Sequence, residues 1–532
     1  MRAQTKRVVS LCLILLPLTV GMTAAASPDL RLVDASAERN TALVRALLKE
    51  GIDVNAARAD GATALLWAAH WDDREAVELL LRAGANVNAA EDHGVTPLAR
   101  ACENASESMV NRLLEAGANP NAAEANGLTP LMTAARTGNL NVVKALLFRG
   151  ANVNAAAVTT HETALMWAVA ERHLDIVRTL VEKGADVHPR PQQAFSPLMA
   201  AAENGDIETA KVLLAAGARV NDTGSDGTRP LPYAIVVGRS AFAHFLLDQG
   251  ADPNGAIDGV TALHAASGPV DTWLKGWNRR HGGARGQSGQ RQRGRLKLTE
   301  RPPLVKALLA RGADPNARMT ASEMTGQGFV RNGAFDTFTT GTGSVAGATP
   351  LWVAAWATNP GAGSASNREY RGVASSNGEI LRSLLAAGAR PDITTNDGTT
   401  TLMAAAGCGR AAHVTNVPRA ERQPTAEEAA GILIEVGVDV NAANEADFTA
   451  LHCAAFSGLN ELVQYIVDRG ADINARDWRG RTPFRLAEGA KQSFHYQEWP
   501  EVAALLQKLG ADTSLGIPGT VHERLRGLAA TK

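Results

Sequence analysis

The feature that most constrains this chain is a sequence repeat with a period of about 33 residues. The string Gly-Ala-Asn/Asp-Val-Asn, or a close variant, recurs at a nearly constant interval at Gly51, Gly84, Gly117, Gly150, Gly184, Gly217 and Gly250. Further variants follow at less regular intervals at Gly312, Gly388, Gly437, Gly470 and Gly510. A length of 532 residues would otherwise predict three or four domains of roughly 150 residues each. A phased period predicts one stack of repeated units instead.

A second string keeps register with the first and marks the start of a helix. It is Thr-Pro-Leu or a near variant, as at Thr96, Thr129, Thr349 and Thr482. The Thr hydroxyl can accept hydrogen bonds from unpaired N–H groups of the first turn, and Pro is tolerated at the first helical position. A second helix follows, with apolar residues at i, i+3 and i+4 such as Val143, Leu146 and Leu147. The glycine of the next Gly-Ala-Asn turn ends that helix.

Together these strings resemble the ankyrin repeat. The match rests on the Thr-Pro-Leu caps, the Ala-Ala pairs of the first helix, the Leu-Leu pairs of the second helix and the Gly-Ala-Asp/Asn turns, and it covers nearly all of residues 30–515. The resemblance implies an all-α solenoid of about twelve helix-turn-helix units, with finger turns between units and a half-unit at 30–50. One family feature is eroded, because the His that follows the Thr-x-Leu string survives only at His264 and His452.

Five insertions interrupt the period, all in the second half of the chain. Their expected bounds are Gly268–Pro303, Met319–Gly347, Asn359–Gly378, Arg410–Thr425 and Gly489–Pro500. The second lies in a finger, and the others separate a first helix from its second helix. We therefore expect the domains to be a signal peptide over 1–26, a regular array over 27–267, an interrupted array over 268–436, C-terminal units over 437–516 and a tail over 517–532.

The segment 1–26 has the pattern of a secretory signal peptide. Arg2, Lys6 and Arg7 precede an apolar run over 8–20, and three alanines at 24–26 supply a cleavage site. The apolar run is short for a membrane anchor, which needs about 20 residues. This leader and the Ala- and Arg-rich composition are typical of an exported bacterial protein. We expect a periplasmic or secreted protein with no transmembrane segment after signal removal.

Outside the leader, the chain keeps Cys102, Cys408 and Cys453. These are too few for a disulfide scaffold. Cys102 and Cys453 fall within expected helices, so we interpret all three as small buried hydrophobic residues. A single disulfide or a reactive thiol stays open as an alternative for a chain outside the cytosol.

Charge is balanced overall and concentrated in the first insertion. Lys+Arg 53 against Asp+Glu 54 gives a net charge of -1, which disfavours a globally basic nucleic-acid binder. Between Asp271 and Arg301, however, nine Lys or Arg stand against two acids, and the Gly-, Gln-, Ser- and Arg-rich centre over 281–294 predicts disorder. One interpretation is an arm for an anionic lipid, polysaccharide or nucleic acid, and the other is a solvated low-complexity loop. Trp273 and Trp277, one helical turn apart, are expected to pack the base of this insertion onto the stack.

The sequence carries no catalytic signature. It lacks His-Glu-x-x-His, Cys-x-x-Cys, Gly-x-Ser-x-Gly and a phosphate loop ending in Gly-Lys-Ser/Thr. Its Asp- and Asn-rich stretches recur with the turns, where these side chains bond their own backbone. We expect no enzymatic activity, no cofactor and no metal. An enzyme whose site is assembled from the insertions is a minor alternative, marked by a deep pocket within 319–378 lined by ionisable groups.

The resemblance implies that a partner binds the finger tips and the concave side of the first helices. Trp and Arg most often dominate binding energy at such surfaces. The candidate contacts are Trp71, His93, Phe195, Trp356, Phe448, Trp478 and Arg479. The candidate arm for an anionic partner comprises Arg279, Arg280, Arg285, Arg291, Arg293 and Arg295. Trp67 and Trp167 occupy an apolar first-helix position and are expected in the core.

The predicted function is therefore a non-catalytic scaffold of the periplasm or extracellular space that binds another protein. The alternative is a cell-envelope tether that uses the basic insertion to hold anionic lipid or polysaccharide. The two differ in salt dependence, because only the tether relies on exposed charge.

Overall fold

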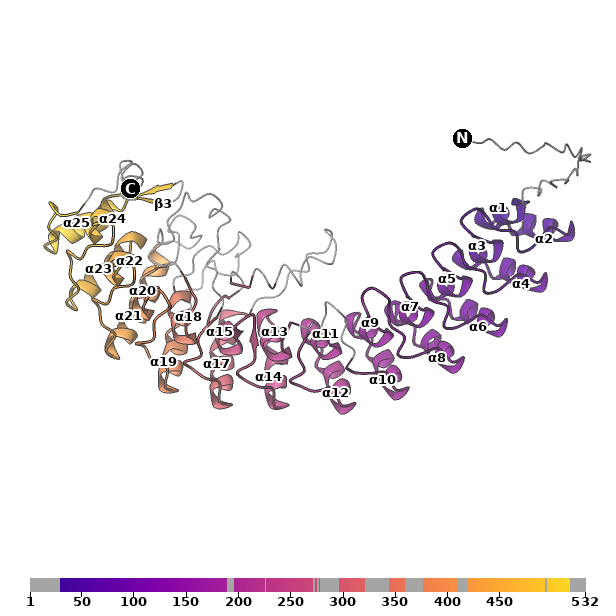
Figure 1. The fold of residues 1–532 in the computed structure, drawn as a ribbon, viewed down its shortest axis with the longest axis horizontal. Helices are drawn as coiled ribbons and strands as arrows, with labels where there is room; N and C mark the ends of the chain where they lie inside the picture. The colour runs from indigo at the N-terminus through magenta and orange to yellow at the C-terminus, as the bar shows by residue number, and fades with distance from the viewer. Residues whose placement is uncertain are drawn as a thin grey trace, which may run out of the picture. The chain divides into compact units, whose positions relative to one another are not determined.

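The computed structural model describes residues 29–188, 196–224, 226–270, 273–274, 277, 296–320, 344–358, 377–408, 419–492 and 495–516. The chain divides into an N-terminal part that ends at Glu124 and a C-terminal part that begins at Ala125. Both parts are built from pairs of short antiparallel helices (Figure 1).

The N-terminal part contains three helix pairs. Its helices are α1 (Arg31–Ala37), α2 (Thr41–Lys49), α3 (Ala64–His70), α4 (Arg74–Arg82), α5 (Pro97–Glu103) and α6 (Glu107–Glu115). The expectation of a half-unit at 30–50 is wrong, because α1 and α2 form a complete pair. This first repeat is nevertheless atypical, since Leu30 precedes α1 and supplies no side-chain cap.

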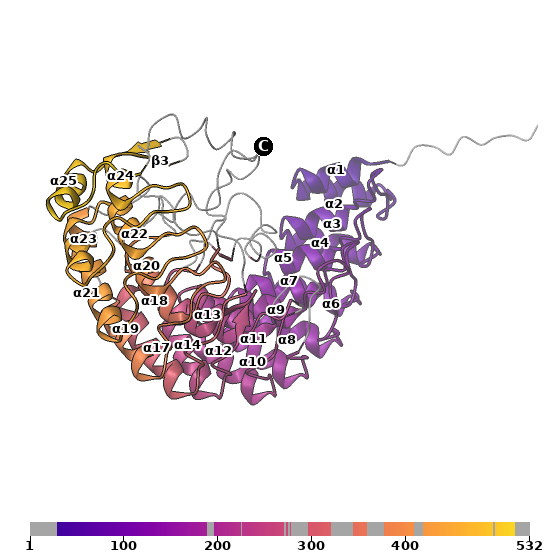
Figure 2. The same ribbon diagram turned by 60° about the vertical axis from the view of Figure 1, so that its left-hand side comes forward.

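The C-terminal part contains nine helix pairs and two short hairpins within its described residues. Its helices are α7 (Pro130–Thr137), α8 (Leu140–Phe148), α9 (Ala164–Ala170), α10 (Leu174–Glu182), α11 (Pro197–Asn204), α12 (Ile207–Ala215), α13 (Pro230–Val236), α14 (Ser240–Asp248), α15 (Ala262–Ser267), η1 (Leu298–Glu300), α17 (Arg301–Ala310), α18 (Pro350–Ala357), α19 (Gly378–Ala386), α20 (Thr401–Ala405), α21 (Arg419–Glu435), α22 (Ala450–Ser457), α23 (Asn460–Val467), α24 (Pro483–Glu488) and α25 (Pro500–Lys508). Its strands are β1 (Ala256–Ile257), β2 (Val260–Thr261), β3 (Ala490–Gln492) and β4 (His495–Gln497). The predicted all-α solenoid of about twelve helix-turn-helix units is confirmed. Within each part, the first helices form one row and the second helices another (Figure 2).

The helix caps follow the predicted chemistry. The Thr349 hydroxyl accepts from the N–H of Trp352 at 3.2 Å, and Pro350 occupies the first position of α18. At the other end of such a helix, Gly138 adopts φ 86°, and a Cβ there would lie 2.5 Å from the ring of His173. Only glycine fits this turn, because both the backbone conformation and the space exclude a side chain.

Asparagine side chains hold consecutive repeats together. Asn88 Oδ1 accepts from the N–H of Asn119 at 2.7 Å, and its Nδ2 donates to the carbonyl of Gly117 at 3.1 Å. The same two bonds to the next turn are made by Asn55, Asn154, Asn221, Asn254, Asn316 and Asn441. The recurrence of this Asn therefore reflects bonds between repeats as well as the local turn. We call this series the Asn ladder.

Removing one member of the Asn ladder should weaken the joint between two repeats. Asn88→Ala removes two hydrogen bonds worth about 1 kcal/mol each, so we expect the free energy of unfolding to fall by about 1–3 kcal/mol. Urea denaturation measures the loss. Asn88→Asp keeps only the acceptor, so its free energy of unfolding should lie between those of wild type and Asn88→Ala. An unchanged midpoint in Asn88→Ala would contradict a coupling role for the ladder.

Three insertions contain more regular structure than predicted. The expectation that the first insertion runs to Pro303 is wrong, because η1 begins at Leu298 and α17 at Arg301. The expectation that the fourth insertion runs to Thr425 is wrong, because α21 begins at Arg419 and continues through Pro424. Burial of Thr425 and the hydrogen bond from its hydroxyl to the carbonyl of Thr358 at 2.9 Å anchor this early turn. In the fifth insertion, β3 and β4 pair antiparallel. The domain boundaries themselves stay predictions.

Candidate interaction site on the C-terminal fingers

The fingers of the last repeats are tied to one another by their backbones. The N–H of Trp478 donates to the carbonyl of Ala446 at 3.1 Å, and the N–H of Glu445 donates to the carbonyl of Asp397 at 3.0 Å. Each finger tip is therefore held by the one before it. A side chain at such a tip is presented from a fixed backbone, which lowers the entropic cost of binding.

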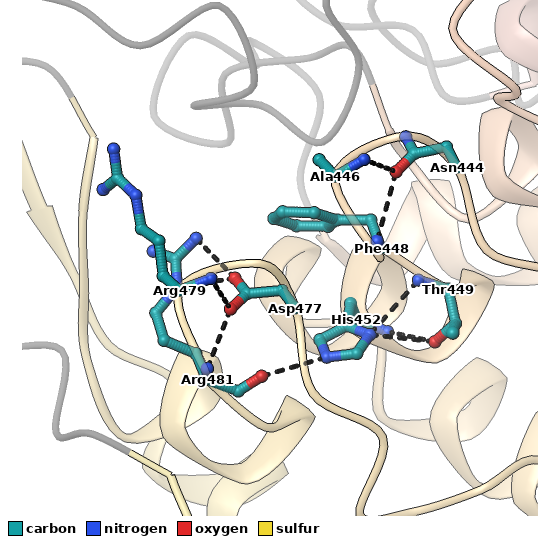
Figure 3. Close-up of polar contacts among 8 residues, drawn as sticks. All are labelled: Asn444, Ala446, Phe448, Thr449, His452, Asp477, Arg479 and Arg481. Atoms are coloured by element: carbon teal, nitrogen blue, oxygen red, sulfur yellow. Dashed lines mark hydrogen bonds and ion pairs between the residues drawn. The ribbon is translucent and has the colours of Figure 1, made fainter. Parts of the chain in front are cut away.

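Asn444 shapes the first of the two fingers at this site. Its Oδ1 accepts from the N–H groups of Ala446 at 3.0 Å and Phe448 at 3.1 Å (Figure 3). Its Nδ2 donates to the hydroxyl of Thr399 in the preceding finger at 3.1 Å. One buried amide thus closes its own turn and fastens it to a neighbour.

Asp477 and Arg481 form a buried ion pair that shapes the second finger. Asp477 Oδ2 accepts from Nε and Nη2 of Arg481, both at 2.7 Å, and its Oδ1 accepts from the N–H groups of Arg479 at 3.0 Å and Arg481 at 2.8 Å (Figure 3). The Asp477 side chain is 0% exposed and that of Arg481 is 7% exposed. A charge pair this deeply buried is tolerated because its donors and acceptors are matched.

Phe448 lies beneath this ion pair. The Arg481 guanidinium carbon is 5.9 Å from the Phe448 ring centre, and the ring of His452 lies 5.6 Å away on the same repeat. Phe448 is only 2% exposed, so the prediction that it is an exposed contact is wrong. It supports the finger from inside.

Trp478 and Arg479 lie at the tip of the same finger. Trp478 is 49% exposed, and the guanidinium of the half-buried Arg479 lies 4.7 Å from its ring centre. An exposed indole with a stacked arginine has the composition of a binding hot spot. Their role as contacts stays a prediction.

His452 links these two fingers as a neutral residue. Its Nδ1 accepts from the N–H of Thr449 at 3.2 Å, so Nε2 carries the proton and donates to the carbonyl of Arg481 at 3.2 Å. Burial lowers the pKa of His452 to about 4. His264 makes the equivalent bonds to Thr261 and the carbonyl of Ala348, and burial lowers its pKa to about 4 as well. The two histidines that keep the family position therefore join one repeat to the next.

Acid should weaken the contacts that His452 and His264 make between repeats. An unfolded histidine has a pKa near 6.5 and a folded one here has a pKa near 4, so the unfolded state binds protons first as the pH falls. Stability is full above pH 6.5 and is lost towards pH 4, by about 2 kcal/mol per histidine at pH 5. Urea midpoints measured from pH 7 to pH 4 test this. Methionine fills the same position at Met132 and Met403, so His452→Met should fold and should lose less stability than wild type between pH 7 and pH 4. The same pH dependence in His452→Met and wild type would contradict a buried neutral His452.

Two predicted tryptophan contacts have structural partners. The indole N–H of Trp71 donates to the carbonyl of Ala37 at the end of α1 at 3.0 Å, although its ring stays 38% exposed. Trp356 is 8% exposed and its ring centre lies 4.9 Å from that of Trp273, so the prediction of an exposed contact is wrong there. Trp356 is buried because Trp273, which belongs to the first insertion, covers it, and a regular repeat has no such segment.

The remaining predicted positions fall into two groups. His93 is exposed on its finger, with Nδ1 3.2 Å from Glu91 Oε2. Phe195 and the six arginines of the basic arm lie outside the described residues. Trp67 and Trp167, expected in the core, are half-buried with the guanidinium groups of Arg58 and Arg136 over their rings at 5.5 and 5.6 Å.

The cysteines do not behave alike. Cys408 and Cys453 form a disulfide, with Cα atoms 5.2 Å apart, whereas Cys102 is a buried thiol outside this bond whose pKa is raised by burial. The interpretation of all three as simple buried hydrophobic residues is wrong for the pair, and the alternative of a single disulfide holds. Cys408 lies just after α20 and Cys453 in α22, so the bond joins consecutive first helices.

The described residues offer little for other chemistry. Across those residues, no group of three or more His, Cys, Asp or Glu side chains is placed to hold a metal ion. Nor does any helix in the same residues have the length and apolar character needed to cross a bilayer. Most of the segment 319–378, where a catalytic pocket would mark an enzyme, lies outside them.

A family comparison decides the assignment. The model for ankyrin repeats in three copies matches residues 32–124, 120–191, 188–257 and 372–477, which is more than half of the chain. The chain belongs to the ankyrin-repeat family. Ankyrin repeats generally mediate protein–protein interaction, and the fold is typically a non-catalytic interaction module.

Individual relatives match only segments of this ankyrin-repeat chain. Protein PhlB of Serratia liquefaciens is 42% identical over 107 residues, covering 20% of this chain and 47% of that protein. Protein phosphatase 1 regulatory subunit 27 of Homo sapiens is 37% identical over 67 residues, covering 13% and 44%. BCL-6 corepressor-like protein 1 of Homo sapiens is 35% identical over 108 residues, covering 20% and 6%. The chain thus spans less than half the length of each. The crystal structure of the human ASB11 ankyrin repeat domain matches 41% of this chain and 96% of its own, at 28% identity and a TM-score of 0.37.

The polar groups that build the fingers were not predicted from the sequence. Asp477 and Arg481 are four residues apart in a segment expected at the surface, where such a pair is ordinarily solvated. In the structure both side chains are buried and the Arg481 guanidinium lies over Phe448 of the preceding repeat, a contact that spacing alone does not reveal.

Proposed function

We propose that this protein is an exported, non-catalytic ankyrin scaffold that binds a partner protein through its finger tips and first helices. The observation that carries the proposal is the Trp478–Arg479 tip, an exposed indole with a stacked guanidinium on a finger fixed by buried bonds. Such a surface presents hot-spot side chains without a large ordering cost. The name of one relative, a regulatory subunit of a protein phosphatase, is consistent with protein binding by repeats of this kind.

Two features support export. The residues at 1–26 have the charge, apolar run and small-residue site of a signal peptide. The Cys408–Cys453 disulfide suits an oxidising compartment such as the periplasm, since disulfides rarely persist in the cytosol. Non-reducing peptide mapping of protein from the native host's exported fraction tests both, because it reports the new N-terminus and the bond together.

Crosslinking in the native compartment tests partner binding. Wild type should capture one specific protein, and Trp478→Ala with Arg479→Ala should reduce its recovery at least tenfold. Phe148→Ala is the matched control, because Phe148 is an aromatic residue 87% exposed on α8 and away from the fingers. Equal recovery with the finger variant and the control would overturn the finger site.

The alternative of an envelope tether rests on the concentration of positive charge in the first insertion. Nine Lys or Arg lie between Asp271 and Arg301 in a chain of net charge -1. Binding to vesicles with anionic lipid should then fall steeply with added salt and disappear when 279–295 are deleted. Salt-independent binding would exclude the tether.

A further inference from the structure

The side of the first helices that a partner would contact is not equally open along the C-terminal part. The exposed fraction of the residue four positions after each helix cap shows this difference. Trp167 in α9 and Ala200 in α11 are half-buried, whereas Tyr233 in α13 and Val353 in α18 are 0% exposed. Thr133 in α7 is buried as well, so burial at this position does not by itself identify a covering segment. At α13 and α18, ring contacts identify one.

Part of the cover is the base of the first insertion. Val270, Trp273, Leu274 and Trp277 follow α15 and are 2%, 6%, 0% and 0% exposed. We call these four residues the strap. Three of them are large apolar side chains in a segment whose following residues are polar, and their burial confirms the prediction that the two tryptophans pack onto the stack.

The strap contacts the repeats on both sides of its own. The indole N–H of Trp277 donates to the hydroxyl of Thr228 at 2.8 Å, and its ring centre lies 5.7 Å from that of Tyr233 in α13. Towards the next repeat, the ring centre of Trp273 lies 4.9 Å from that of Trp356 in α18. The strap therefore lies across three consecutive first helices, α13, α15 and α18.

The chain enters the strap pressed against α18. A Cβ at Gly268 would lie 2.8 Å from a side-chain carbon of Val353 and 3.1 Å from its carbonyl. Glycine permits this close approach. The strap thus occupies the first-helix side as a bound peptide would, with two buried indoles as anchors and one indole hydrogen bond.

We propose that the first-helix side of α13, α15 and α18 is a docking site for an aromatic peptide, and that the strap is its intramolecular occupant. The strap keeps these repeats closed, so a partner docks there only by displacing it. The ligand class is a peptide with two tryptophans four positions apart around an apolar residue. The inference rests on the proposed function in taking the partner to be a protein that binds the first helices, and it concerns a different surface from the fingers.

A labelled synthetic peptide of residues 268–279 tests the proposal with the full chain. Fluorescence anisotropy should show no binding to wild type, whose site is filled. It should show saturable binding to Trp273→Ala with Trp277→Ala, at least tenfold tighter than to wild type. A peptide with both tryptophans replaced by alanine should not bind either protein. Phe148→Ala, which removes an exposed aromatic side chain of α8 outside the strap, should behave as wild type.

Three results would overturn the proposal. One is a double variant with wild-type circular dichroism that does not bind the peptide, and another is equal binding to wild type and variant. The third is loss of folding in both the double variant and Trp277→Ala alone, because a releasable strap must be dispensable for the fold. None of these depends on partner capture, so failure here is distinguishable from failure of the finger site.

Discussion

Replacing Asp477 with alanine should lower the free energy of unfolding by about 3–5 kcal/mol, the cost of removing one member of a buried ion pair. The loss is large because the buried guanidinium of Arg481 loses the carboxylate that accepts from its Nε and Nη2. Two backbone N–H groups, those of Arg479 and Arg481, also lose their acceptor. Urea denaturation of the full chain measures the change. The C-terminal repeats of the variant should unfold at a lower urea concentration than those of wild type.

Three variants separate the ion pair from general surface effects. Glu445→Ala removes an exposed carboxylate from the preceding finger and should change stability by less than about 0.5 kcal/mol. Asp477→Asn keeps acceptor capacity without charge, so it should lose more stability than Glu445→Ala and less than Asp477→Ala. Asp477→Leu with Arg481→Met removes both charges and should recover part of the loss. A change below about 1 kcal/mol in Asp477→Ala would contradict the structural role.

Breaking the disulfide should have an effect of similar size. Cys408 and Cys453 are separated by 45 residues, and closing a loop of that length stabilises a fold by about 4 kcal/mol in the chain-entropy model. Cys408→Ser should therefore lower the urea midpoint substantially. Wild type with a reductant should shift by a comparable amount, since both treatments release the same loop.

The comparison with reductant makes the disulfide prediction specific. Cys408→Ser should show no further shift when reductant is added. Cys102→Ala should stay as sensitive to the reductant as wild type, because Cys102 is not part of the disulfide. A wild type that unfolds at the same urea concentration with and without reductant would show that this cross-link does not stabilise the protein.

The repeat architecture was predictable because its determinants are local. A Thr cap such as Thr349, a turn glycine such as Gly138 and the apolar pattern of the second helix all act over short stretches of chain, and each recurs in phase. The exposed tip at Trp478 was predictable for the same reason, since finger tips occupy a fixed place in the repeat.

Burial of individual contacts was not predictable because it depends on distant segments. Trp356 is covered by Trp273, which belongs to an insertion in an earlier repeat, and Phe448 by Arg481 of the next repeat. Cys408 and Cys453 meet because consecutive first helices pack together. A repeat pattern gives the position of each side chain within its own unit, and insertions then alter which positions remain open.

The Asn ladder separates the length of a loop from the continuity of the stack. Asn254 reaches Gly312 at 3.1 Å across the first insertion, the same distance at which Asn88 reaches Gly117 with no insertion between them. The bonds that join one repeat to the next therefore bypass the added residues. Such an architecture lets a lineage lengthen, exchange or diversify its loops without rebuilding the scaffold, and it marks the first insertion as a place where foreign sequence can be grafted.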